Sequence, residues 1–163
     1  MYADFYKRIS QPFRKGNRRR ILAVADKALV AITAISFVGI AFYLLLNQDE
    51  RVVRYVLVCG VSFLVLSAIR ALLNKPRPYE LYPIDALIAK STQGKSFPSR
   101  HLFSASLISC AFFWLNPCLG LLGFLVTAAL AFIRVIGGVH FPKDVIVGIV
   151  AGILAGIIGL YLI

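Results

Sequence analysis

Acidic residues are scarce in this sequence, and charged residues of either sign are few. Its 163 residues include 7 Asp and Glu against 18 Lys and Arg, and only 15% are charged. A soluble domain usually carries about 25% charged residues. The 60% of apolar residues are also too many for the core of so small a soluble protein. The composition therefore excludes a soluble globule and a disordered chain, and it predicts an integral membrane protein.

Cysteine is also rare, and its three positions match no disulfide framework and no zinc pattern. Cys59 and Cys110 lie inside apolar runs and Cys118 lies at the edge of one, as expected of small buried hydrophobic residues. No cleavable signal peptide is evident, because the N-terminus is polar and basic.

Long apolar runs are what the sequence has in abundance, and they predict an all-α bundle of about five transmembrane helices. We expect flanking residues to extend the short third and fourth runs, with local thinning of the bilayer; a shallow hairpin is the alternative. Together the runs form one membrane-embedded domain, 28–163. They cover residues 28–46, 52–73, 102–115, 118–133 and 145–163.

Residues 1–27 differ in kind from this domain. Tyr2, Phe5, Tyr6 and Ile9 share one face of a predicted helix, and eight Lys and Arg supply positive charge. This pattern predicts an amphipathic helix on an anionic leaflet. We expect no nucleic-acid partner, because a basic run beside a membrane span is usually a topology signal.

Positive charge is distributed unequally between the two sides of the predicted bundle. Five alternating spans place 16 Lys and Arg with the N-terminus and 2 on the other side. The positive-inside rule then predicts a cell-membrane protein with a cytoplasmic N-terminus and an outside C-terminus.

Ionisable and hydroxyl residues gather at four span ends, which span parity brings to one face of the membrane. Arginines without matching acids favour a phosphate, and helix N-termini add N–H donors. Ser99 is placed to cap the third span, to bind the anion, or both in turn. Because this face lies on the side of the N-terminus, the count of Lys and Arg predicts that it is cytoplasmic. The residues of this set are Arg70, Arg77, Ser99, Arg100, His101, Arg134, His140 and Asp144.

The two histidines suit phosphoryl transfer. Asp144 stands four residues after His140, so its carboxylate can orient the imidazole as a nucleophile. His101 is then the candidate general acid. The arginines would stabilise charge on the transferred group.

The motifs resemble those of the type-2 phosphatidic acid phosphatase family, which shares its site with the vanadium haloperoxidases. Arg70 stands where the family has Lys, with Arg77-Pro78 at the expected distance. Residues 98–101 read Pro-Ser-Arg-His, with Arg100 in place of Gly. Ile133, in place of Ser, precedes Arg134, and the downstream His and Asp follow.

The resemblance implies a lipid phosphate phosphatase that needs no metal or other cofactor. It implies a phosphohistidine on His140, with Asp144 as its partner and His101 as the acid for the leaving group. It also implies that phosphate is bound by Arg70, Arg77, Ser99, Arg134 and the backbone N–H of Arg100.

The substrate class remains open at this point. Phosphatidylglycerophosphate, phosphatidate or a polyprenyl phosphate in the cytoplasmic leaflet all fit the expected reaction. One alternative is an undecaprenyl diphosphate phosphatase with an outward-facing site. Another is a non-catalytic protein that binds anionic lipid.

Two further features carry predictions. Residues 79–90, within the polar stretch 74–98, are expected to form a lip that guides lipid phosphates to the site. Gly148, Gly152 and Gly156 form a small-residue stripe that packs inside the monomer or forms the seam of a homodimer.

Overall fold

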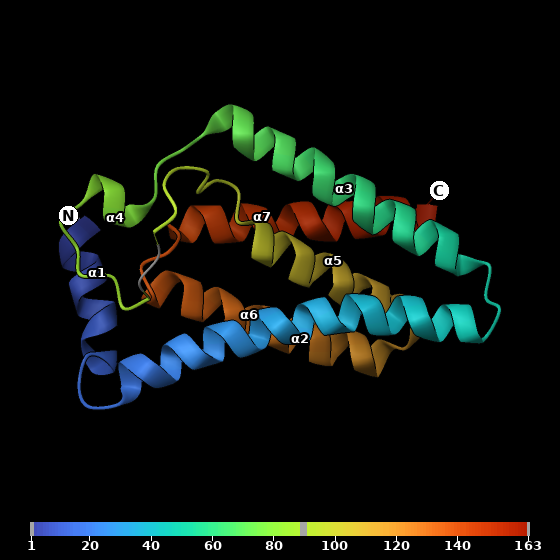
Figure 1. The fold of residues 1–163 in the computed structure, drawn as a ribbon, viewed down its shortest axis with the longest axis horizontal. Coiled ribbons are helices and arrows are strands. Elements are labelled where there is room, and N and C mark those ends of the chain that lie inside the picture. Colours follow the sequence, from blue (N-terminus) through green and yellow to red (C-terminus); the bar gives the residue numbers. More distant parts are fainter. Residues whose placement is uncertain (1, 89–90, 163) are drawn as a thin grey trace.

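The computed structural model describes residues 2–88 and 91–162, and the described residues include helices and connecting segments but no strand. Figure 1 shows the long helices side by side along one axis and the short α1 across one end, with the N-terminus at that end and the C-terminus near the other. The elements are α1 (Tyr2–Ser10), the 3-10 turn η1 (Gln11–Phe13), α2 (Arg18–Leu46), α3 (Arg51–Leu73), α4 (Pro78–Leu81), α5 (Arg100–Leu115), α6 (Pro117–Ile136), α7 (Pro142–Gly156) and its π-helical continuation η2 (Ile157–Leu162).

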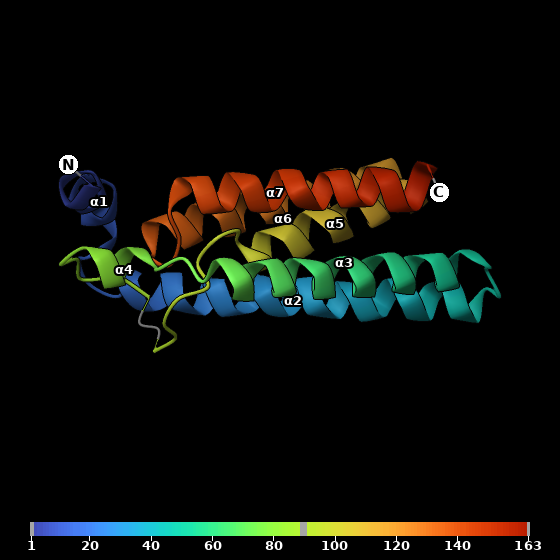
Figure 2. The same ribbon diagram turned by 90° about the horizontal axis from the view of Figure 1, so that it is seen from above.

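Four helical stretches are long and apolar enough to cross a membrane, and α5 is a shorter apolar helix. Figure 2 shows α2 and α3 in one layer and α5, α6 and α7 in the other. The prediction of an all-helical, multi-pass membrane bundle is confirmed. The four long stretches are Arg18–Leu46, Arg51–Leu81, Pro117–Ile136 and Pro142–Leu162.

The short helix α5 is the centre of the bundle. Its 16 residues span roughly 24 Å, less than the roughly 30 Å of hydrocarbon in a bilayer. It contacts α2, α3, α6 and α7, and most of its residues are buried. Because protein rather than lipid surrounds α5, its shortness needs no thinning of the bilayer.

The glycine stripe of α7 faces α5 of the same chain. Gly148, Gly152 and Gly156 are all buried. A Cβ at Gly148 would lie 2.6 Å from the Ser99 carbonyl oxygen, and one at Gly156 would lie 2.6 Å from Cys110 Cβ. The stripe therefore serves packing inside the monomer, which brings the first turns of α5 and α7 together.

The first membrane helix begins earlier than the predicted boundary at residue 28. α2 starts at Arg18, so the basic run 18–20 forms its first turn. Its 29 residues span roughly 43 Å, which exceeds the hydrocarbon thickness by more than two turns. From this length we expect the helix to continue out of the apolar layer, with its first-turn arginines at headgroup level.

The N-terminal helix α1 packs against the segment that follows α3. Tyr6 is 1% exposed, and its hydroxyl accepts a hydrogen bond from the Leu87 N–H at 3.1 Å. The Tyr2 and Tyr82 rings lie 4.9 Å apart, whereas Phe5 stays 45% exposed. The predicted helix is present, but the chain itself covers part of its apolar face, because two tyrosines gain partners there.

Candidate active site

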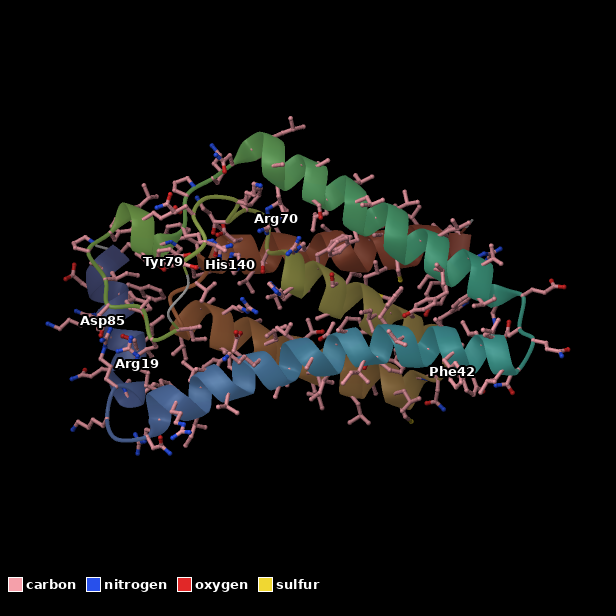
Figure 3. The ribbon with its side chains drawn as sticks, viewed as in Figure 1. Arg19, Phe42, Arg70, Tyr79, Asp85 and His140 are labelled. Carbon is pink, nitrogen blue, oxygen red and sulfur yellow. The ribbon has the colours of Figure 1, made fainter. Side chains whose placement is uncertain are left out.

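The polar residues predicted from span parity meet at the end of the bundle that carries α1 and α4. Arg70 lies in the last turn of α3, Arg134 in the last turn of α6, and Asp144 in the first turn of α7. Figure 3 shows Arg70 and His140 in the half of the molecule that holds α1 and α4, inward of Arg19 and Asp85, with Phe42 in the other half. Side chains of this kind are seldom buried unless they are paired or bind a ligand. Five of them are nearly inaccessible: Arg70 is 7% exposed, Arg77 8%, Arg134 1%, His140 1% and Asp144 1%.

The His140 imidazole turns its Nδ1 toward Asp144, with the Ser96 hydroxyl beside both groups. Nδ1 lies 3.7 Å from Asp144 Oδ2 and 3.3 Å from Ser96 Oγ. Ser96 Oγ donates to the same carboxylate oxygen at 2.5 Å. A hydroxyl that donates to a carboxylate still has lone pairs for an Nδ1–H. This arrangement assigns the proton to Nδ1 and leaves the lone pair on Nε2.

Backbone hydrogen bonds fix the two helix N-termini that frame the site. The Ser99 N–H donates to the Asp144 carbonyl at 2.9 Å, which ties the start of α5 to that of α7. The Phe141 N–H donates to Asp144 Oδ2 at 3.2 Å. Pro142 occupies the first turn of α7, as its fixed φ favours.

Two arginines hold the loops around the imidazole by donating to backbone carbonyls. Arg70 donates to the Pro98 and Lys95 carbonyls, which fixes the approach to α5. Arg77 Nε donates to the Gly94 carbonyl at 3.1 Å, and its Nη1 lies 3.5 Å from the Val139 carbonyl. These partners are neutral carbonyls, which bring no negative charge to the site.

Arg134 has an acidic partner from the other layer of the bundle. Its Nε lies 2.8 Å from Asp26 Oδ1 of α2, and both side chains are almost fully buried. Arg77 lies close enough to act electrostatically on Arg134 and on His140. The described site thus has three buried guanidiniums against the carboxylates of Asp26 and Asp144, which favours an anionic ligand.

Ser99 occupies the N-cap position of α5 without capping the helix through its side chain. Its hydroxyl is buried and has no hydrogen-bond partner among the residues that the structure describes. A buried hydroxyl without a partner is costly, so it is typical of a ligand site. Of the uses predicted for Ser99, the geometry favours anion binding.

Burial, together with the positive charges of Arg77 and Arg134, lowers the pKa of His140 to about 4, against the opposing effect of Asp144. The imidazole is therefore neutral at physiological pH. A neutral imidazole is the form that carries a nucleophilic lone pair.

Arg100 and His101, in the first turn of α5, lie toward a different space from the buried arginines. Both line a cavity of about 470 Å³ between α2, α3 and α5. The Arg100 guanidinium carbon lies 5.2 Å from the centre of the Phe63 ring on α3. Arg100 is exposed, although its charge still acts on Arg70. The predicted residues therefore fall into two sets. Arg100 and His101 lie on the cavity side, and the buried set consists of Arg70, Arg77, Ser99, Arg134, His140 and Asp144.

The sequence interpretation missed two residues of this site, Ser96 and Asp26. Ser96 is fully buried, and its only signal was a hydroxyl three residues before Ser99. Asp26 stood as an isolated acid in a strongly basic stretch beside a span. A single acidic residue beside a basic stretch, at the edge of a membrane span, indicates a buried basic partner.

The comparisons with known proteins agree with this geometry. Residues 51–163 match the model of the PAP2 superfamily. The chain belongs to the PAP2 superfamily. Undecaprenyl-diphosphatase BcrC of Bacillus subtilis (strain 168) is 30% identical over 141 residues, which cover 82% of this chain and 72% of that protein.

Two solved structures share the fold. LpxE of Aquifex aeolicus has a TM-score of 0.75 at 23% identity, over 96% of this chain and 93% of that one. The first transmembrane PAP2 type phosphatidylglycerolphosphate phosphatase from Bacillus subtilis has a TM-score of 0.56 at 19% identity, over 97% and 94%. The predicted class, a membrane phosphatase of the PAP2 type acting on lipid phosphates, is confirmed.

One departure from the PAP2 motifs has a plain structural explanation. Ile133, where the family has Ser, is buried in an apolar cluster with Leu22, Ile88 and Ile136. The position therefore packs α6 against α2 and the segment after α4.

Proposed function

We propose that the chain hydrolyses a phosphomonoester or diphosphate of a membrane lipid through a phosphohistidine on His140. The observation that carries the proposal is the neutral, buried imidazole, whose Nδ1 faces Ser96 and Asp144 within a ring of buried arginines. A tetrahedral phosphoryl group supplies the several oxygens that such a ring needs.

In the first step the phosphoryl group lies among Arg70, Arg77, Arg134, the Ser99 hydroxyl and the Arg100 N–H. The His140 Nε2 lone pair attacks phosphorus, and the bond from phosphorus to the leaving oxygen breaks. His101 gives its proton to that oxygen. The cation that forms on the His140 ring is stabilised through Nδ1 by Ser96 and Asp144.

In the second step water replaces the lipid alcohol or lipid phosphate. His101, now neutral, takes a proton from the water, whose oxygen attacks phosphorus. The phosphorus–nitrogen bond breaks, and inorganic phosphate leaves. The arginines stabilise charge on the phosphoryl oxygens through both steps, and no metal or other cofactor takes part in this scheme.

The substrates we propose are phosphatidylglycerophosphate, phosphatidate and polyprenyl phosphates of the cytoplasmic leaflet. The inward facing rests on the 16 Lys and Arg at the site end against 2 at the other end. The similarity to an undecaprenyl-diphosphatase favours the second candidate, a polyprenyl diphosphatase with an outward-facing site. A purely lipid-binding role would not require both imidazoles and the carboxylate.

The test of the function is phosphate release from a lipid panel by purified protein in detergent or vesicles. The panel holds phosphatidylglycerophosphate, phosphatidate, a polyprenyl phosphate and a polyprenyl diphosphate. We expect turnover of at least one of them, and none by His140→Ala. Unchanged turnover by that variant would refute the mechanism.

The test of facing is thiol labelling in intact cells with a reagent that does not cross the membrane. Asp85→Cys reports the site end and Gln48→Cys the opposite end, both in a Cys118→Ser background, because Cys118 is exposed. An inward site predicts labelling at 48 alone. Labelling at 85 alone supports the outward-facing alternative.

Two earlier predictions stay proposals. The proposed lip packs partly against α1 and α6, because Leu87 and Ile88 are buried. Leu81, in contrast, is 55% exposed. Residues 89 and 90 of the lip lie outside the described residues. A neutral linker replacing 79–90 should reduce turnover of lipids while sparing soluble phosphate esters.

A homodimer over the stripe of Gly148, Gly152 and Gly156 would compete with α5, which already covers these glycines.

A further inference from the structure

The cavity beside the candidate active site runs from the first turn of α5 into the bundle. Along α5 its lining extends from Arg100 to Ile108, roughly 12 Å by helix rise, and α2, α3 and Leu130 of α6 line its other sides. Most lining side chains are apolar, as in Phe37 and Leu107, and the described lining residues include no carboxylate. The space suits a hydrocarbon chain whose polar end lies near Arg100 and His101.

Arg100 places a cation where that polar end would lie. Its guanidinium rests over the Phe63 ring, 5.2 Å from the ring centre, on the α3 side of the cavity. The buried arginines, in contrast, donate to loop carbonyls or pair with Asp26 around His140. The two sets of cations therefore flank different parts of a substrate.

His101 follows Arg100 on the same turn and lines the same cavity. In the proposed function His101 gives its proton to the leaving oxygen, so the leaving group departs on the cavity side. The leaving group of a monoester is a neutral alcohol, which gains nothing from a nearby cation. The leaving group of a lipid diphosphate is a lipid monophosphate, whose negative charge a guanidinium binds strongly.

We infer that Arg100 makes the enzyme selective for lipid diphosphates by binding the phosphate that stays on the lipid. The inference rests on the proposed function. His140 Nε2 bonds to the terminal phosphorus, and the bond between that phosphorus and the bridging oxygen breaks. The bridging oxygen takes the His101 proton and leaves as lipid monophosphate held by Arg100, and water then releases inorganic phosphate from His140.

The experiment uses two substrates with one tail, farnesyl diphosphate and farnesyl monophosphate, in detergent micelles. The readout is the ratio of kcat/KM for the diphosphate to that for the monophosphate, which cancels any loss common to both. We expect the wild type to favour the diphosphate and Arg100→Ala to lower the ratio about tenfold, the strength of one charge-assisted contact. Arg100→Lys should give an intermediate ratio.

Lys143→Ala is the matched control, because Lys143 is another exposed cation at this end, 5.6 Å from the Phe141 ring centre. Its ratio should stay that of the wild type. A ratio that changes less than threefold in Arg100→Ala, or falls equally in Lys143→Ala, overturns the inference while leaving the proposed function intact. Turnover of both substrates by His140→Ala would instead overturn the proposed function.

Discussion

The molecule carries two ionic clusters in the same half, and they differ in burial. On the surface, Arg14 and Arg19 reach one carboxylate, that of Asp85, at 2.6 and 3.2 Å. In the interior, the arginines around His140 are at most 8% exposed and outnumber the acids. The surface cluster attaches the N-terminal region to the segment after α4 and is screened by solvent. Each cluster has one arginine more than it has acids, but only in the buried cluster is the excess charge protected from solvent screening and able to bind a phosphate strongly.

The largest contrast is expected in stability. Asp26→Ala leaves Arg134 as a buried charge without its partner, so the free energy of unfolding in detergent should fall by about 3–5 kcal/mol. Asp85→Ala removes two solvent-exposed pairs and should cost about 1 kcal/mol or less. Denaturant titration followed by circular dichroism measures both. Equal losses would show that burial does not distinguish the clusters.

The same contrast should appear in activity when one arginine is removed from each cluster. Arg77→Ala should lower kcat/KM by about 10²–10³, the usual effect of losing a group that stabilises transition-state charge. Arg14→Ala should stay within about twofold, because that side chain contacts no part of the candidate site. Phosphate release with the best lipid of the panel is the measurement. A large loss in Arg14→Ala would show that attachment of α1 controls the site.

Burial can be tested directly through the titration of His140. The pKa of His140 in the folded state is about 4, below the usual value of about 6.5. The folded protein therefore binds fewer protons than the unfolded chain between these values. The contribution of the neutral His140 to the free energy of unfolding is complete above about pH 6.5 and is lost as pH falls toward 4. Because the chain has two histidines, His101→Asn leaves one imidazole for ¹⁵N NMR. Its spectrum should remain that of a neutral ring at pH 5.5, and a protonated ring there would contradict the geometry.

A smaller effect is expected at Ser96, which positions the imidazole without contacting substrate. Ser96→Ala should lower kcat about tenfold with little change in KM, because the link from Nδ1 to Asp144 is lost but phosphate binding is not. Ser96→Thr, which keeps the hydroxyl, should recover part of the rate. Ser109→Ala, on α5 but away from the cavity, is a control for the loss of a buried hydroxyl as such. A rise in KM with kcat unchanged would place Ser96 among the phosphate ligands.

Much of the architecture followed from local patterns. Apolar runs located the helices, and their alternating direction brought Arg70, Arg134 and Asp144 to one end, as the structure confirms. Such patterns work because a membrane helix satisfies its own backbone hydrogen bonds and its length is set by the bilayer. The glycine stripe likewise located a close helix contact, although not its partner.

What was missed depends on contacts between distant segments. Nothing near Asp26 in the sequence indicates that it meets Arg134, 108 positions later. Ser96 belongs to the site only because the loop before α5 folds over the start of α7. The early start of α2 and the packing of α1 also depend on partners, such as Leu87 for Tyr6, which helix periodicity does not identify.

The central claim is that His140 is the nucleophile in a buried cationic site, and trapping the phosphoenzyme tests it most directly. Protein mixed with substrate labelled in its terminal phosphate is quenched in alkaline denaturant, which preserves phosphohistidine, and the labelled peptide is sequenced by mass spectrometry. The account predicts label on His140 and none in His140→Ala. Label on His101, or turnover with no labelled histidine at any time point, would contradict it.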